Sequence, residues 1–201
     1  MTSAGGALTP ASKPSNLNVP NVITIVRILL APVFLIMLLV DNGQDGPLRW
    51  AAAALFIVAI ATDGIDGHIA RKYDLVTDLG KLLDPIADKV LTGAALVGLS
   101  ILGELWWWVT IVILVREIGI TVWRFLVLSD RVVPASRGGK LKTLFQSFAI
   151  SFALVPLPNV LGDWMYWVNW VLMAIALVLT VVTGIDYIVQ DQRLNRRPAQ
   201  R

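Results

Sequence analysis

The 201-residue chain contains no cysteine and only one histidine, His68, which excludes two common kinds of site. Without cysteine there is no disulfide and no thiolate site, and one histidine cannot form a multi-histidine metal centre. Charged residues are also scarce, at 15% of the chain, whereas soluble domains carry about a quarter. Hydrophobic residues make up 56%, and the mean hydropathy is +0.71. These values indicate a polytopic membrane protein.

Six apolar stretches match the length of membrane-spanning helices, which need about 20 residues to cross the hydrocarbon core. They cover residues 22–40, 49–66, 84–102, 105–128, 142–160 and 164–188. The breaks between them are short and rich in Gly, Pro and charged residues, and leave no room for a soluble domain. We therefore expect an all-α membrane domain over residues 16–190, with six transmembrane helices and a short N-terminal juxtamembrane segment. Residues 1–15 are predicted to be a disordered polar tail and residues 191–201 a basic tail.

The connecting segments carry different charges on the two sides of the expected bundle. The segments 66–84, 129–142 and 191–201 are rich in Lys and Arg. The opposite loops hold one cation and four acids: Arg49 against Asp41, Asp45, Glu104 and Asp163. Basic loops face the cytoplasm in most membrane proteins, so both termini are expected there. The basic C-terminal tail is then mainly a topology signal that also attracts anionic lipid head groups.

Four of the six aspartates in the 26 positions from Asp63 to Asp88 form the pattern D-x-x-D-G-x-x-A-R-x8-G-x-x-x-D-x-x-x-D. Asp63 and Asp66 are three residues apart, and Asp84 and Asp88 four, so each pair projects from one face of a helix. Acids beside membrane-spanning helices are costly and usually belong to a functional site. Two such helices packed together would gather four carboxylates, which suit Mg²⁺ or Mn²⁺.

Small residues and cations accompany these acids. Gly67 and Ala70 share the helical stripe of Asp63, and Gly80 shares that of Asp84. Their small side chains leave room for a nucleotide, but they are also typical of close helix packing, and Gly80 is compatible with a helix break. A second alternative is that the acids only form ion pairs at the membrane surface. The cations available for such pairs are Arg71, Lys72, Lys81 and Lys89.

The complete pattern resembles the signature of the CDP-alcohol phosphotransferases, integral membrane enzymes of phospholipid synthesis. Segments 18–27, 116–118 and 139–146 further resemble the phosphatidylglycerophosphate synthases of bacteria. The resemblance extends over roughly residues 16–190. It implies a multi-pass protein of the bacterial cell membrane, with its active site facing the cytoplasm, and a homodimer.

The resemblance also implies the roles of individual residues. Asp63, Asp66 and Asp84 would coordinate one or two divalent ions, either Mg²⁺ or Mn²⁺. Asp88 would be the general base and is also a candidate ligand of the second ion; the residues alone leave both roles open. The pocket for the CDP-lipid would be lined by Asp66, Gly67, Ala70, Arg71 and Gly80.

Such a site would transfer a phosphatidyl group from CDP-diacylglycerol by two-metal-assisted displacement. The acceptor hydroxyl would lose its proton to Asp88 and attack the phosphorus that bears the lipid, and CMP would leave. Arg71 would add a fixed positive fork suited to phosphate.

Further polar residues in the apolar helices bear on the choice of acceptor. The candidates for binding an acceptor phosphate are Thr24, Arg27, Arg116, Arg124, Lys140 and Lys142. Glu117 is expected to orient one of these cations. The alternatives are an intramembrane ion pair between Arg116 and Glu117, and ordinary cytoplasm-facing lysines at 140 and 142.

A surplus of cations suits an acceptor that carries a phosphate, such as glycerol 3-phosphate or inositol 1-phosphate. The resemblance at 116–118 and 139–146 favours glycerol 3-phosphate, which would give phosphatidylglycerophosphate. The related alternatives are a phosphatidylinositol phosphate synthase and a cardiolipin synthase of the same superfamily. An alternative of another class, a divalent-cation transporter, predicts acids near the middle of the bilayer instead of at its edge.

Overall fold

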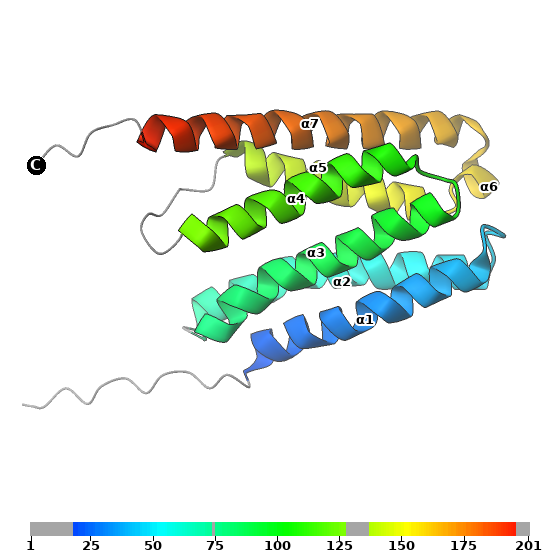
Figure 1. Cartoon of the computed structure of the whole chain (residues 1–201). Coiled ribbons are helices and arrows are strands. Elements are labelled where there is room, and N and C mark those ends of the chain that lie inside the picture. Colours follow the sequence, from blue (N-terminus) through cyan, green and yellow to red (C-terminus); the bar gives the residue numbers. More distant parts are fainter. Residues whose placement is uncertain (1–17, 74, 128–136, 196–201) are drawn as a thin grey trace, which may run out of the picture.

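The computed structural model describes residues 18–73, 75–127 and 137–195, except for a few side chains that include those of Asp66, Arg71 and Arg124. Within these ranges the chain forms seven helices and no strand. They are α1 (Val19–Asp41), α2 (Pro47–Lys72), α3 (Asp78–Ile101), α4 (Trp107–Val127), α5 (Arg137–Leu154), α6 (Pro158–Leu161) and α7 (Trp164–Asn195). Apart from the short α6, the helices lie side by side and successive ones run in opposite directions (Figure 1). The predicted all-α fold is therefore confirmed.

Three helices in the described ranges are long and apolar enough to cross a membrane by length and composition. They are α1, the first part of α2 (Pro47–Ile65) and most of α7 (Trp164–Gln190). The other long helices, α3, α4 and α5, carry many of the charged residues predicted for the site. The chain is thus a helical membrane protein, while the number of six spans stays a prediction. The predicted tails, 1–15 and 191–201, lie largely outside the described residues.

The helices that bear the aspartate motif extend beyond the apolar stretches. As predicted, α2 continues without a break past Asp63, and it ends at Lys72. α3 starts earlier than the predicted span at 84, because the Thr77 hydroxyl caps it by accepting a hydrogen bond from Gly80 N at 3.0 Å. Gly80 therefore lies in the first turn of α3, and the break expected at this glycine lies before Asp78.

The core fills the middle of the bundle, where α1 packs mainly against α2 and α3, and α5 packs against α7. Phe34 of α1 and Phe56 of α2 are fully buried, with ring centroids 5.5 Å apart. Gly98 lets α1 approach α3 closely, since a Cβ at this position would lie 2.6 Å from Cδ2 of Leu38. This packing fixes the relative position of the three helices that carry the aspartates and their neighbours.

The end of the bundle away from the chain termini is held by Arg49, which is 2% exposed. Its guanidinium donates to both carboxylate oxygens of Glu104, at 2.9 and 2.5 Å. It also donates to the carbonyl oxygens of Leu154 and Ala153, at 2.7 and 2.9 Å. Arg49 thus ties α2 to the α3–α4 turn and to the end of α5. The single cation predicted for the acidic loops therefore has a structural role.

Candidate active site

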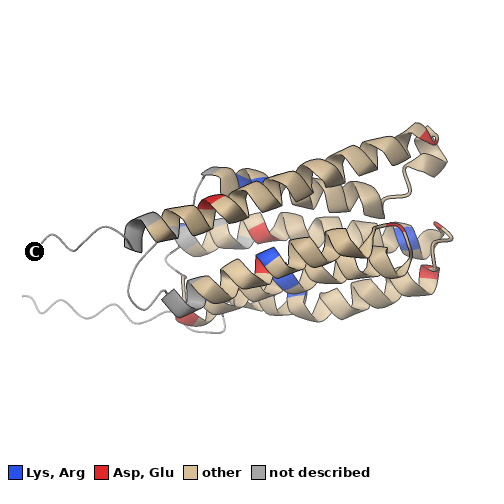
Figure 2. Cartoon of the chain, turned by 45° about the horizontal axis from the view of Figure 1, so that its top comes forward, with Lys and Arg blue, Asp and Glu red and all other residues tan. Residues whose placement is uncertain are grey.

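The polar residues of the protein are concentrated at particular places in the bundle. Much of the length of the helices carries no charge. Lys, Arg, Asp and Glu gather in the half of the bundle nearer the chain termini and at the connections between helices at the far end (Figure 2). The aspartate motif occupies the C-terminal part of α2 and the N-terminal part of α3. Both segments lie in the half nearer the termini, where the turn between α2 and α3 joins them.

Three of the four predicted metal ligands have described side chains, and the structure brings them into one region. Asp84 and Asp88 both interact electrostatically with Asp63. Within the described side chains no three acids or histidines converge on a single metal position, and the side chain of Asp66 is not among them. The donor set nonetheless fits a hard divalent cation, because it consists of neighbouring carboxylates with partial access to solvent.

Each of these aspartates has a partner from the chain itself. Asp63 forms an ion pair with the buried Arg27, and Asp84 accepts a hydrogen bond from the Thr24 hydroxyl at 2.8 Å. Asp88 pairs with Lys89 at 2.8 Å. Thr24 and Arg27 were predicted for the acceptor phosphate, but they lie against the acids of α2 and α3. This placement favours a role in holding the aspartates.

A cavity of about 240 Å³ opens beside the acids and contains three residues predicted for the CDP-lipid: Gly67, Ala70 and Gly80. Asp84 lines it too. Gly80 has a further reason to be glycine, because a Cβ there would lie 2.5 Å from Oδ1 of Asn21. The predicted small residues therefore share one cavity, and one of them also permits α1 to approach.

Asn21 is a residue of the site that the sequence analysis missed. It is 3% exposed, and its Nδ2 donates to the Thr77 hydroxyl at 2.7 Å. Nearby, Asn18 Nδ2 donates to the carbonyl oxygen of Leu75 at 2.7 Å, which ties the α2–α3 turn to the start of α1. A signal was present in the sequence: Asn18, Asn21, Thr24 and Arg27 recur every three residues in an otherwise apolar helix.

A second, larger cavity of about 770 Å³ joins the acids to the predicted acceptor residues. Asp63 and Asp88 line one part of it. The remaining lining includes several cations: Lys81, Lys89, Arg116, Lys140 and Lys142. Lys81 lines both cavities, so the two are neighbours. Three of the acceptor predictions thus share a cavity with the proposed base, whereas the side chain of Arg124 lies outside the described residues.

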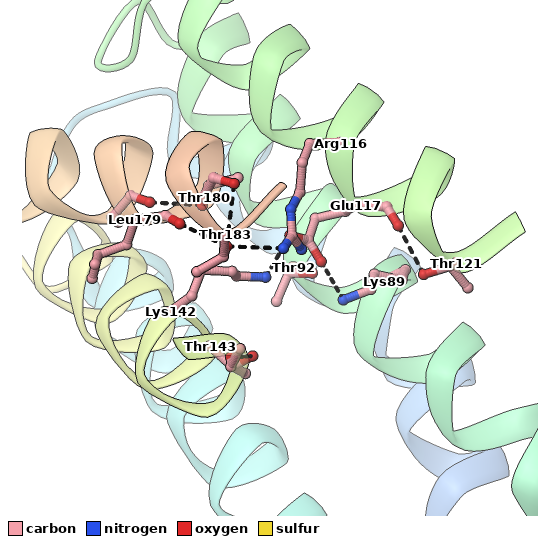
Figure 3. Close-up of polar contacts among 12 residues, drawn as sticks. Lys89, Thr92, Arg116, Glu117, Thr121, Lys142, Thr143, Leu179, Thr180 and Thr183 are labelled. Atoms are coloured by element: carbon pink, nitrogen blue, oxygen red, sulfur yellow. Dashed lines mark hydrogen bonds and ion pairs between the residues drawn. The ribbon is translucent and has the colours of Figure 1, made fainter. Parts of the chain in front are cut away.

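The most densely connected polar group of this cavity is Glu117 on α4, which is 4% exposed (Figure 3). Its carboxylate accepts hydrogen bonds from Lys89 at 2.6 Å, from Arg116 at 3.0 Å and from Lys142. Arg116 also donates to the Thr183 hydroxyl of α7 at 2.9 Å. The ion pair between Arg116 and Glu117, which was one of the alternatives, is present, and Glu117 also contacts Lys142 from the predicted set. Lys89 and Thr183 were not predicted for the acceptor.

Comparison with known proteins gives consistent matches over most of the chain. A family model described as CDP-alcohol phosphatidyltransferase matches residues 17–182. A "Probable phosphatidylglycerophosphate synthase" of Mycobacterium tuberculosis is 46% identical over 176 residues, which cover 88% of this chain and 82% of the relative. Two relatives named "CDP-diacylglycerol--glycerol-3-phosphate 3-phosphatidyltransferase" are each 39% identical over 85% of this chain. The match covers 94% of the one from Rickettsia typhi and 93% of the one from Bacillus subtilis.

Proposed function

The chain belongs to the CDP-alcohol phosphatidyltransferase family, and from this premise we propose that it transfers the phosphatidyl group of CDP-diacylglycerol to glycerol 3-phosphate. The products are phosphatidylglycerophosphate and CMP. Relatives whose names state this reaction are 39% identical to the chain over most of both lengths. Membership of the family argues against the divalent-cation transporter considered as an alternative.

One observation carries the assignment of a phosphorylated acceptor: a single cavity holds both Asp88 and a group of cations. Lys89 links the two, because its ammonium group contacts Asp88 and Glu117. In this proposal the phosphate of the acceptor lies near Arg116 and Lys142, and its hydroxyl group points toward Asp88. Serine, choline and ethanolamine carry no phosphate and do not need these cations.

The chemistry proposed for the chain's own residues is a displacement at phosphorus. The Asp88 carboxylate takes the proton of the acceptor hydroxyl, and the oxygen attacks the phosphorus that bears diacylglycerol. The bond from that phosphorus to the CMP oxygen breaks, and CMP leaves. The binding residues hold the donor phosphate and the hydroxyl in line, which supplies much of the rate enhancement.

The carboxylates of Asp63, Asp66, Asp84 and Asp88 are the residues that would hold one or two Mg²⁺ or Mn²⁺ ions. When bound, such an ion supplies positive charge that offsets the charge of the donor diphosphate. Thr24 and Arg27 orient the acids from α1. For the donor itself we propose the pocket of Gly67, Ala70 and Gly80, with Asp66 and Arg71 beside it.

The site is proposed to face the cytoplasm of a bacterial cell, in a protein with six membrane spans and both termini on that side. The basic connecting segments support this orientation. The N-terminal end of α1 and the C-terminal end of α7 lie at the same end of the bundle (Figure 1), as an even number of crossings requires. The membrane domain is taken as residues 16–190, between two polar tails, and the working unit as a homodimer.

The reaction is tested by CMP release from purified protein supplied with CDP-diacylglycerol and Mg²⁺ or Mn²⁺. The acceptors to compare are glycerol 3-phosphate, inositol 1-phosphate, phosphatidylglycerol and serine. We expect release with glycerol 3-phosphate. Release with inositol 1-phosphate alone would identify a phosphatidylinositol phosphate synthase, and release with phosphatidylglycerol alone a cardiolipin synthase; either result contradicts the proposal.

A further inference from the structure

Glu117 contacts three cations that come from three successive long helices. Lys89 belongs to α3, Arg116 to α4 and Lys142 to α5. Both carboxylate oxygens are used: Oε1 accepts from Arg116 and Lys142, and Oε2 accepts from Lys89. Figure 3 shows these side chains pointing toward one another between the helices. A single acid therefore connects the helices around the larger cavity.

Electrostatics makes this acid necessary for the arrangement. The side chains of Lys142 and Glu117 are only 3% and 4% exposed, and that of Arg116 is 18% exposed. Like charges that lie this close repel one another strongly where water is largely excluded. The carboxylate of Glu117 reduces this repulsion, so it permits three cations to occupy one small region.

Glu117 does not occupy all the hydrogen-bond donors of the cations around it. An ammonium group has three hydrogen-bond donors. Within the described residues, Lys142 uses one on Glu117, and Lys89 uses two, on Glu117 and Asp88. Nε of Arg116 is buried and has no hydrogen-bond partner in that part of the chain. Lys89 and Lys142 therefore keep donors for a ligand with several acceptor oxygens, whereas Nε of Arg116 is enclosed beside Gly184.

Arg116 is also restrained from α7. Its guanidinium donates to Thr183, which in turn donates to the carbonyl oxygen of Leu179 at 2.6 Å. A Cβ on Gly184 would lie 3.1 Å from Cγ of Arg116, so the glycine leaves space for the arginine side chain. Thr183 and Gly184 thus fix the direction from which Arg116 reaches Glu117.

We infer that Glu117 is a positioning residue, whose carboxylate holds Lys89, Arg116 and Lys142 in the arrangement that receives the phosphate of the acceptor. The inference rests on the proposed function and adds to it the residue that organises the acceptor half of the site. Glu117 contacts cations of its own chain and no reacting atom. Through Lys89, which also pairs with Asp88, it sets the distance between the bound phosphate and the proposed base.

The first test is Glu117→Gln, which keeps the size of the side chain and removes its charge. We expect the KM for glycerol 3-phosphate to rise about tenfold or more, the effect of losing a charged hydrogen bond. The KM for CDP-diacylglycerol should not change, because the donor cavity is lined by other residues. Glu117→Asp keeps the charge on a shorter side chain and should restore part of the affinity for glycerol 3-phosphate.

The matched control is Glu104→Gln, which neutralises another acid that pairs with a buried cation, at the far end of the bundle. This variant should lose stability without a selective change in either KM. An equal rise in both KM values for Glu117→Gln, or an unchanged or lower KM for glycerol 3-phosphate, would overturn the inference. Should Glu117→Gln fail to fold, Glu117→Asp carries the same test against the same control.

A binding measurement separates this inference from the proposed reaction. Inorganic phosphate should raise the melting temperature of the wild type and of Glu104→Gln, and should raise that of Glu117→Gln much less. If phosphate stabilises the wild type much more than Glu117→Gln, but the wild type releases no CMP with glycerol 3-phosphate, the proposed reaction is contradicted and the role of Glu117 stays supported. Equal stabilisation of the wild type and Glu117→Gln by phosphate overturns the inference. A wild type that phosphate does not stabilise overturns the inference.

Discussion

At the scale of single residues, Asp88 is the group on which the proposed chemistry depends most directly. Asp88→Asn keeps the shape of the side chain but cannot accept the proton of the alcohol. We expect kcat to fall by about 10²- to 10⁴-fold, the usual contribution of a general base. Binding of CDP-diacylglycerol, measured as thermal stabilisation by the donor, should persist.

Asp78→Asn is the matched control for Asp88, because Asp78 lies on the same helix and its side chain is 93% exposed. It should keep normal turnover. Normal turnover in Asp88→Asn as well would remove Asp88 from the role of base and leave it as a candidate metal ligand only.

Gly80 offers a second test at this scale. The glycine is explained either by close packing of the helices or by the space that a nucleotide needs, and its surroundings allow the first explanation to be tested. Alanine at this position would place Cβ 2.5 Å from Asn21 Oδ1 and 3.2 Å from the Thr77 hydroxyl. Because Asn21 is buried and bonded to Thr77, it cannot move away freely. We expect Gly80→Ala to lower the free energy of unfolding by about 1–3 kcal/mol, as overpacking does, and to raise the KM for CDP-diacylglycerol.

Gly119→Ala is the comparison for Gly80, because a Cβ on Gly119 meets no atom within 4 Å. It should fold at least as well as the wild type, since alanine favours a helix over glycine. Equal stability of the two alanine variants would show that the contact between Gly80 and Asn21 does not constrain the fold.

The residues that were predictable from the sequence are those related by local helical spacing. Asp84 and Asp88 share one face of α3 because they are four residues apart, and their approach to Asp63 follows from packing two neighbouring helices. The partners from α1 were not predictable in the same way. Thr24 bonds to a residue 60 positions away, and Arg27 to one 36 positions away. Such pairings depend on how the helices pack, which local periodicity does not determine.

At the scale of helices, the apolar runs predicted which segments are helical more accurately than they predicted the residue at which each helix begins. The first turns of α3 contain Asp78, Lys81 and Asp84, so they are not apolar enough to extend a predicted span. They are helical because Thr77 caps the helix and the acid of the first turn favours its N-terminus. Gly67, Ala70 and Gly80 lie on such extensions, outside the predicted spans 49–66 and 84–102, so hydropathy alone misplaces the ends of the two helices that carry the site.

Arg49 provides the test at this scale, because it joins α2 to the α3–α4 turn and to α5. Arg49→Met removes one partner of a largely buried pair and leaves Glu104 and two carbonyl groups without their donor. We expect the free energy of unfolding in detergent to fall by about 3 kcal/mol. The double variant Arg49→Met/Glu104→Gln should recover part of this loss, because no uncompensated charge remains. A single variant as stable as the wild type would mean that this pair does not hold the bundle end.

At the scale of the whole molecule, α3 joins two functional halves. Its Asp88 belongs with the acids and with α1 and α2, whereas the adjacent Lys89 reaches Glu117 of α4. α5 and α7 complete the second half through Lys142 and Thr183. The sequence could place all these residues on one side of the membrane by charge. The sequence could not show which residues belong to the half around the aspartates and which to the half around Glu117. That division depends on the order of the helices in space, which is set by side-chain packing throughout the bundle.

The number of membrane crossings is the property of the whole molecule that is most open to a decisive test. The wild type has no cysteine, so single cysteines can be labelled without background. Gln44→Cys lies in the exposed α1–α2 turn, and Gln192→Cys lies near the C-terminal end of α7. Five crossings separate the two positions if every long helix spans, so a membrane-impermeant maleimide should label position 44 in intact cells and position 192 only after lysis.

If only α1, α2 and α7 crossed the membrane, two crossings would separate these positions and both cysteines would be labelled from the same side. Labelling of position 192 alone in intact cells would instead keep six spans and reverse the orientation. The site would then face away from the cytoplasm, where soluble glycerol 3-phosphate is available. This one pair of variants therefore distinguishes six spans from the three of α1, α2 and α7 alone, and it reports the side of the membrane on which each end of the bundle lies.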